Sequence, residues 1–202
     1  MIKLPVYKSL RRPTVEVKVG TVRIGGNNPV RIQTMITSQA SDIEATVGEC
    51  MKMAGAGAEL VRIATPTVKD AEALSIVRQE LRNKGYSIPL IADIHFNPDI
   101  AEIAAGNVEK IRINPGNFTD RQAMLQPEIL EFDRRWNDDL TKLRTRFVAL
   151  LKICKDCGTA LRIGSNHGSL SGRMMSRYGN TPAGMVESAM EFLRICRDED
   201  FN

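Results

Sequence analysis

The sequence predicts an α/β protein of the TIM-type barrel class, with about five β/α units behind an N-terminal β-hairpin. Short apolar runs of strand length alternate with longer segments of helical period, an order typical of parallel sheets that are covered by helices. A doubly wound sheet is the alternative, but a hairpin before the first strand suits the bottom of a barrel. Eight units usually need about 250 residues, so we expect these 202 residues to leave the barrel incomplete.

The composition suits a soluble globular domain that binds a small anion. Of the 202 residues, 43% are hydrophobic and 26% are charged, and no apolar run approaches the span of a bilayer or the core of a signal peptide. We therefore expect a cytoplasmic protein without membrane contact. The net charge is +4, but Lys and Arg are scattered among acids and only 5% of residues are aromatic. This pattern disfavours nucleic acid as a partner and favours a small anionic ligand.

The N-terminal residues are predicted to form an arm and a hairpin. Residues 1–13 are basic and punctuated by proline, which suggests a loose arm before a partial barrel domain at 14–202. Apolar residues alternate over 15–24 on both sides of Gly20, which predicts a β-hairpin. A glycine and asparagine run follows and separates this hairpin from the main sheet.

The first two β/α units are predicted within residues 30–84. Their strands are expected at 30–35 and 60–64, where apolar residues form short runs. Ser41 and Glu44 have the spacing of a capping box and predict the start of the first helix. The second helix, at about 67–84, carries apolar residues at helical spacing on one side: Leu74, Val77 and Leu81.

Three further units follow, with strands predicted at 88–92, 110–113 and 160–164. Asn97 and Pro98 suit the N-terminus of a short helix between the first two of these strands. A long helix is expected before the third, because its apolar positions alternate at spacings of four and three: Trp136, Leu140, Leu143, Phe147, Leu150, Cys154 and Cys157. A last helix after Thr181 is predicted to pack through Val186, Ala189 and Leu193.

Three of the strands contain an arginine between two apolar residues: Arg62 in VRIA, Arg112 in IRIN and Arg162 in LRIG. Each arginine is expected to point to the opposite face of the sheet from its neighbours. A guanidinium inside a barrel needs either an ion pair or an anion at the mouth. Ion pairs with acids such as Asp93 or Glu59 are one interpretation. Because the pattern recurs at the ligand-binding end of the strands, we favour a phosphate or diphosphate site.

Both histidines of the chain follow strands directly, His95 after Asp93 and His167 after Asn166. Each of them can simply bond a loop backbone, but acid–base or substrate-orienting work is the better use for His95, with Asp93 or a neighbour fixing its tautomer. The small residues at 164–169 offer backbone N–H groups for a phosphate. No Cys or Asp falls at a familiar metal-ligand spacing around the histidines, so we predict no metal site here.

Cys154 and Cys157 form a CxxC pattern that suggests a metal or redox site at first sight. Both continue the apolar positions of the long helix, and the sequence contains no second CxxC to complete four ligands. We therefore predict two buried, structural cysteines. The uneven spacing of all four cysteines suggests reduced thiols.

Four motifs occur together in the order VRIATPT, IADIHF, RINPGN and RIGSNHGSLSGRMMSRYGNTPAGMVESAMEF. From about Arg12 to its end the chain thereby resembles the 4-hydroxy-3-methylbut-2-enyl diphosphate synthase (IspG or GcpE) family, and NHGSLS and SRYG resemble its long, three-domain form. The resemblance implies a TIM barrel, an extra domain and a small domain with a 4Fe-4S cluster. It also implies that this chain ends before the cluster ligands and a substrate-binding S-x-K-x-S segment, and that it is inactive alone.

The resemblance implies reductive opening of 2-C-methyl-D-erythritol 2,4-cyclodiphosphate in non-mevalonate isoprenoid biosynthesis. Asp93 and His95 match positions at the barrel mouth, and we predict that they are catalytic. The predicted substrate-binding residues are Arg62, Arg112, Asn114, Arg162, Asn166 and His167. In the complete protein we expect a homodimer that receives electrons from ferredoxin or flavodoxin.

A second hypothesis is a cluster-free barrel enzyme or binder for another phosphorylated or pterin-like compound, similar to dihydropteroate synthases. The DIHF, RINPGN and NHGSL motifs together favour the first hypothesis. A nucleic-acid-binding role ranks third, since the composition disfavours it.

Overall fold

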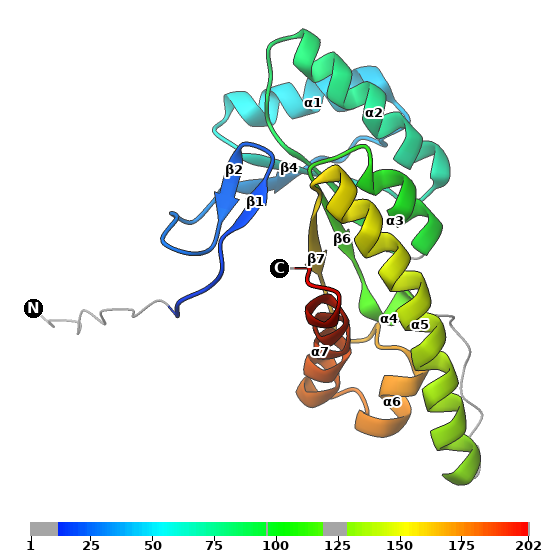
Figure 1. The fold of residues 1–202 in the computed structure, drawn as a ribbon. Coiled ribbons are helices and arrows are strands. Elements are labelled where there is room, and N and C mark those ends of the chain that lie inside the picture. The colour runs from blue at the N-terminus through cyan, green and yellow to red at the C-terminus, as the bar shows by residue number, and fades with distance from the viewer. Residues whose placement is uncertain (1–11, 96, 119–128, 202) are drawn as a thin grey trace, which may run out of the picture.

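The computed structural model describes residues 12–95, 97–118 and 129–201, with side chains in the last range from Trp136 onward. The predicted arm at 1–13 lies outside the described residues apart from its last two. Five parallel strands form the main sheet (Figure 1). In sheet order, which is also chain order, they are β3 (Gln33–Met35), β4 (Leu60–Ala64), β5 (Leu90–Ile94), β6 (Lys110–Ile113) and β7 (Ala160–Ile163).

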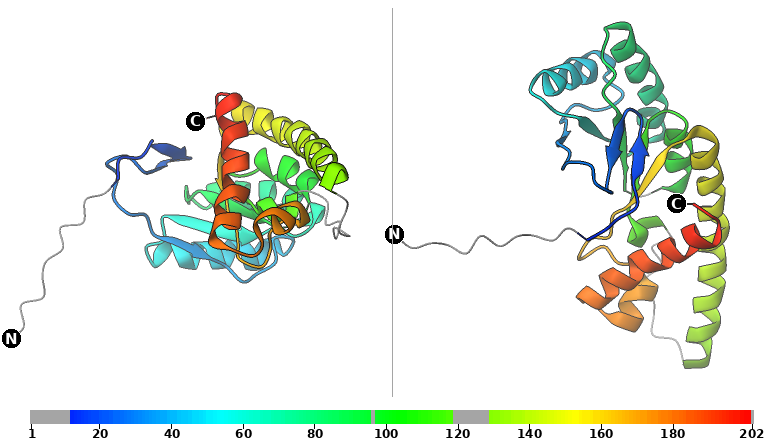
Figure 2. Two further views of the ribbon diagram at one scale, coloured as in Figure 1. Left: turned by 90° about the horizontal axis from the view of Figure 1, so that it is seen from below. Right: turned by 60° about the vertical axis from the view of Figure 1, so that its left-hand side comes forward.

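The helices lie between the strands in sequence and follow one another around the sheet (Figure 1, Figure 2). They are α1 (Ile43–Gly55), α2 (Val68–Asn83), α3 (Pro98–Ala105), α4 (Pro115–Phe118), α5 (Ile129–Cys157), α6 (Gly172–Tyr178) and α7 (Pro182–Asp198). Neighbouring pairs are in contact: α1 with α2, α2 with α3, α3 with α5, and α5 with α7. Within the described residues, β3 and β7 each pair on one side only, so the sheet is open. The predicted partial barrel is confirmed.

Alternation along the strands divides the sheet into an apolar face and a charged face. The apolar face packs against the helices and forms the core with Val61, Ile63, Leu90, Ala92, Ile94, Ile111 and Ile113. We call the opposite face the inner face, and its charged residues on β4 to β7 are Arg62, Asp93, Lys110, Arg112 and Arg162. The strand period of two therefore places all three repeated arginines on one side of the sheet.

The predicted hairpin is confirmed and covers the N-terminal end of the inner face. Strands β1 (Val17–Val19) and β2 (Val22–Ile24) pair antiparallel around a turn in which Gly20 has a φ of 57°. Val19 packs with the first or second residues of three main strands, namely Leu60, Ile91 and Ala160. This apolar contact excludes water from the bottom of the inner face, so a ligand has access from the opposite end.

Two predicted boundaries near the first strand are wrong. Asp42, not Ser41, caps α1: its carboxylate accepts a hydrogen bond from the backbone N–H of Ala45 at 3.1 Å. The backbone N–H of Ser41 instead donates to the Asp70 carboxylate at 3.2 Å. The first main strand is also shorter than predicted, because regular pairing with β4 begins at Gln33.

The predicted packing face of the last helix is wrong as well. Val186 and Leu193 are 58% and 47% exposed, and Ala189 is half-buried. The buried face of α7 is set instead by Phe192, whose ring stands 4.8 Å from that of Phe147, and by Glu191. Glu191 makes two hydrogen bonds, of 2.6 and 2.5 Å, to the buried guanidinium of Arg173 on α6. These two contacts set the orientation of α7, so the side that carries Val186 and Leu193 faces away from the core.

None of the described helices is both long enough and apolar enough to span a bilayer.

Candidate functional site

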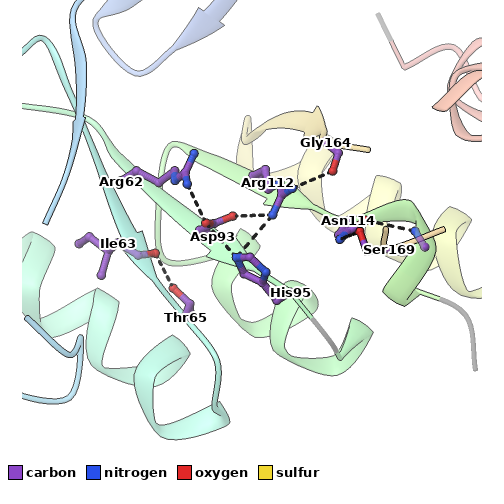
Figure 3. A network of polar contacts seen from close by, with 10 residues as sticks. Arg62, Ile63, Thr65, Asp93, His95, Arg112, Asn114, Gly164 and Ser169 are labelled. Atoms are coloured by element: carbon purple, nitrogen blue, oxygen red, sulfur yellow. Dashed lines mark hydrogen bonds and ion pairs between the residues drawn. The ribbon is translucent and has the colours of Figure 1, made fainter. Parts of the chain in front are cut away.

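A fully buried carboxylate, that of Asp93 on β5, lies at the centre of the inner face (Figure 3). Its Oδ1 lies 3.2 Å from Nη1 of Arg112, and its Oδ2 lies 3.2 Å from Nη2 of Arg62. Nε2 of His95 lies 3.1 Å from the same Oδ2. The strand register creates this cluster, because Asp93 is directly opposite Arg112 and one strand away from Arg62. Each charge is thus paired as burial requires.

Arg112 connects Asp93 to the loop that follows β7. Its Nη2 donates to the carbonyl oxygen of Gly164 at 2.8 Å, and its side chain is only 7% exposed. With the side-chain amide of Asn166 turned so that its oxygen faces this nitrogen, Asn166 accepts a hydrogen bond at 3.1 Å. A Cβ at position 164 would stand 2.3 Å from Nε of Arg112. The glycine of the LRIG pattern is therefore required at position 164, because any larger side chain would occupy the space in which the Arg112 guanidinium lies.

The loops after β6 and β7 pack against each other through Asn114 and Gly116. Nδ2 of Asn114 donates to the hydroxyl of Ser169 at 2.9 Å, and its Oδ1 accepts from the backbone N–H of Gly116 at 3.2 Å. A Cβ on Gly116 would lie 1.6 Å from the carbonyl oxygen of Ser169. Two motifs that stand about fifty residues apart, RINPGN and GSNHGS, therefore form one surface beside the Asp93 cluster.

The inner face of β4 to β7 carries four cationic side chains, Arg62, Lys110, Arg112 and Arg162, against one carboxylate. Asp93 neutralises Arg62 and Arg112 in part, whereas no described carboxylate lies within 4.0 Å of Lys110 or Arg162. Two buried polar atoms near the cluster, Nε of Arg62 and Oγ of Ser165, also have no hydrogen-bond partner among the described residues. The surplus of positive charge and of donors suits a multiply charged anion.

Comparison with known proteins decides the family. The model of the GcpE TIM-barrel domain matches residues 14–202. The chain belongs to the GcpE TIM-barrel domain family. Its relatives include proteins named 4-hydroxy-3-methylbut-2-en-1-yl diphosphate synthase (flavodoxin). That of Bacteroides fragilis is 51% identical over 199 residues, which are 98% of this chain and 32% of the relative. That of Protochlamydia amoebophila is 46% identical over 197 residues, or 98% and 30%.

The chain thus spans about a third of the length of the curated relatives it matches. Among solved structures, a dihydropteroate synthase of Xanthomonas albilineans aligns with 90% of this chain and 73% of its own, at 19% identity and a TM-score of 0.41. A likeness of that size does not establish a shared fold.

Within this GcpE barrel domain, the predicted site residues divide into two groups. One network joins Arg62, Asp93, His95 and Arg112, and Asn114 and Asn166 lie in the two loops beside it. Arg162 is exposed on the inner face, opposite Arg112 in the strand register. His167 is exposed, and no hydrogen bond joins it to another described residue.

Two charged residues of the GcpE barrel domain escaped the sequence interpretation. Lys110 stands two residues before Arg112, so the strand period alone would have placed it on the inner face. Glu49 of α1 reaches the loop after β3, where it accepts hydrogen bonds from the backbone N–H groups and hydroxyls of Thr37 and Ser38. These bonds lower the pKa of Glu49 to about 2. No local pattern indicates that contact, because the partners are eleven or twelve residues apart.

The cysteine prediction is half correct. Cys154 is buried in α5, whereas Cys157 is exposed one turn later, where α5 ends and Gly158 turns the chain with a φ of 66°. No group of three or more His, Cys, Asp or Glu side chains among the described residues is placed to hold a metal ion. The described donors therefore do not fit an iron–sulfur cluster, which needs several thiolates in one place.

We expect alkylation by iodoacetamide at pH 8 to modify Cys157 well before the other three cysteines. Burial raises the pKa of Cys50 and of Cys154 to about 12 and that of Cys196 to about 11, so their reactive thiolates are scarce as well as covered. Peptide mass spectrometry against time measures the order of modification. A Cys157→Ser variant should lose the fast phase, and equally fast labelling of Cys154 would contradict the burial described above.

Proposed function

We propose that this domain is the substrate-binding part of an enzyme that reductively opens 2-C-methyl-D-erythritol 2,4-cyclodiphosphate to 4-hydroxy-3-methylbut-2-enyl diphosphate. The observation that carries the proposal is the cationic inner face, which lies open at the carboxyl ends of the strands and includes Arg162 without a carboxylate partner. A diphosphate supplies both the negative charge and the acceptor oxygens that this face lacks. The names of relatives that match 98% of the chain support the same assignment.

In this proposal, the arginines bind and orient the diphosphate. The carboxylate of Asp93 pairs with both Arg62 and Arg112. These ion pairs fix both guanidinium planes before the ligand binds and so reduce the entropic cost of binding. In this proposal Asn166 and His167 contribute further polar groups from the loop after β7, and Asn114 contributes by holding that loop through its hydrogen bond to Ser169. His95, whose Nε2 faces Asp93, serves as an acid–base or substrate-orienting group with its tautomer set by that carboxylate.

The remaining assignments concern the complete protein. Residues 14–202 form the partial barrel after an arm at 1–13, and the two electrons consumed by the ring opening come from a 4Fe-4S cluster whose ligands lie outside this chain. Flavodoxin, which appears in the names of the relatives, or a ferredoxin delivers these electrons. We further propose a cytoplasmic homodimer, and we propose that this segment alone is inactive.

Arg162 offers the cleanest test of the proposed site. In the complete protein, we expect Arg162→Lys to weaken binding of the cyclic diphosphate by roughly 1.5–3 kcal/mol, because a lysine cannot donate two parallel hydrogen bonds to a phosphate. The melting temperature should stay unchanged, since no described carboxylate pairs with Arg162. Isothermal titration calorimetry and differential scanning calorimetry measure the two quantities. Arg112→Lys does not separate them, because Arg112 also holds Asp93 and Gly164.

Arg78→Lys is the matched control, because Arg78 lies on α2 among the helices that cover the opposite face of the sheet. It should change neither affinity nor melting temperature. A lowered melting temperature with full affinity in Arg162→Lys would contradict a role in binding. Binding of a pterin diphosphate in place of the cyclic diphosphate would support the dihydropteroate-synthase-like alternative.

A further inference from the structure

Lys110 is a cation of the inner face that the network around Asp93 does not neutralise. It begins β6, two residues before Arg112, and stands opposite Ile91 on one side and Ala160 on the other. The side chain is half-buried, and no described carboxylate lies within 4.0 Å of it. Burial and the nearby positive charges of Arg162 and Arg62 lower the pKa of Lys110. The surroundings of Lys110 in the ligand-free protein thus disfavour its charged form.

Asp93 is already fully engaged by other partners. Its Oδ1 pairs with Arg112, and its Oδ2 pairs with Arg62 and His95. A carboxylate has only two oxygens, so this one has little capacity left for a fourth cation. The inner face of β4 to β7 carries no second carboxylate that could serve as a counter-charge for Lys110.

Unsatisfied donors on the inner face and in the loop after β7 indicate what kind of group is missing. The buried Nε of Arg62 has no acceptor among the described residues, and neither has the buried Oγ of Ser165. Arg162 adds a guanidinium without a described carboxylate. A second carboxylate would neutralise one of these groups, whereas a diphosphate carries enough oxygens and charge to engage several of them at once.

We propose that Lys110 is a further diphosphate-binding residue, which reaches the same anion as Arg62 and Arg162 from the hairpin side of the inner face. This inference rests on the proposed function, since it assigns one more residue to that site. The ligand-free protein accepts like charges in a half-buried place, and the bound anion relieves their repulsion. Affinity and ligand-free stability should therefore respond to Lys110 in opposite directions.

The test uses the complete protein with three variants: Lys110→Met, Lys110→Arg and, as a control, Lys152→Met. Lys152 is exposed on α5 and belongs to no part of the site. Binding of the cyclic diphosphate is followed by titration calorimetry, and the melting temperature is measured without ligand. We expect Lys110→Met to weaken binding roughly 10- to 100-fold, the range for one hydrogen bond to a charged group. Its ligand-free melting temperature should equal or exceed that of the unmodified protein.

Lys110→Arg keeps the charge and should bind within a few-fold of the unmodified protein, and Lys152→Met should match it in both measurements. A lower melting temperature with full affinity in Lys110→Met would show that Lys110 pairs with a carboxylate, and would overturn the inference. Unchanged values in both measurements would overturn it too. If Arg162→Lys weakens binding while Lys110→Met does not, only the role of Lys110 fails. If the unmodified protein does not bind the cyclic diphosphate, the proposed function fails with it.

Discussion

Replacing Asp93 with alanine is expected to lower the free energy of unfolding by roughly 3–5 kcal/mol, the usual loss when one member of a buried ion pair is removed. Asp93 is fully buried, and its carboxylate is the counter-charge of both Arg62 and Arg112. Arg112 is nearly buried, so the variant keeps an uncompensated charge inside the fold. Differential scanning calorimetry of the complete protein measures the loss.

Two variants frame this result. Asp93→Asn keeps the shape and the hydrogen-bonding oxygen but not the charge, and should fall between the alanine variant and the unmodified protein. Asp138→Ala removes an exposed carboxylate from α5 and should change stability by no more than about 0.5 kcal/mol. If Asp93→Ala and Asp138→Ala had the same melting temperature, the ion pairs of Asp93 would not contribute to stability. The orientation of the arginines would then need another cause.

Gly116→Ala should be strongly disruptive, because a Cβ at this position would approach backbone atoms more closely than at any other described glycine. The new Cβ would lie 1.6 Å from the carbonyl oxygen of Ser169 and 2.9 Å from Cα of Leu170, both of which are backbone atoms that cannot rotate away. The two loops must separate, which breaks the hydrogen bond between Asn114 and Ser169. We expect a loss of at least about 1–3 kcal/mol, as for overpacked cores, with weaker diphosphate binding.

Gly48→Ala provides a control of opposite sign. Gly48 lies inside α1, and a Cβ there meets nothing within 4 Å. The same chemical change should therefore stabilise the protein by about 0.4–1 kcal/mol through reduced chain entropy. Thermal melting of both variants gives the comparison. Equal melting temperatures for the two would refute the close approach of the loops.

The order of the elements was accessible from the sequence, and so was the face of the sheet on which the candidate site residues lie. Strand-length apolar runs and helical periods are local patterns, so the five β/α units and the hairpin were predicted in their observed order. The repeated arginines were placed on one face of the sheet for the same reason. Where prediction failed, the deciding contact was not local. The buried face of α7 depends on contacts with Phe147 and Arg173, which are distant in the sequence. The exposure of Cys157 depends on where α5 ends and the chain turns into β7.

The choice between ion pairing and ligand binding for the three arginines also depended partly on local sequence and partly on tertiary structure. The sequence by itself determined that Arg62, Arg112 and Arg162 each point away from the apolar neighbours in their strand, because alternation along a strand depends on nothing outside it. Only the tertiary structure decided that Asp93 pairs with two of the three, and that Lys110 stands beside Arg162 without a described counter-ion. That outcome depends on the register between strands whose residues are 19 to 50 positions apart, which hydrogen bonding across the assembled sheet sets.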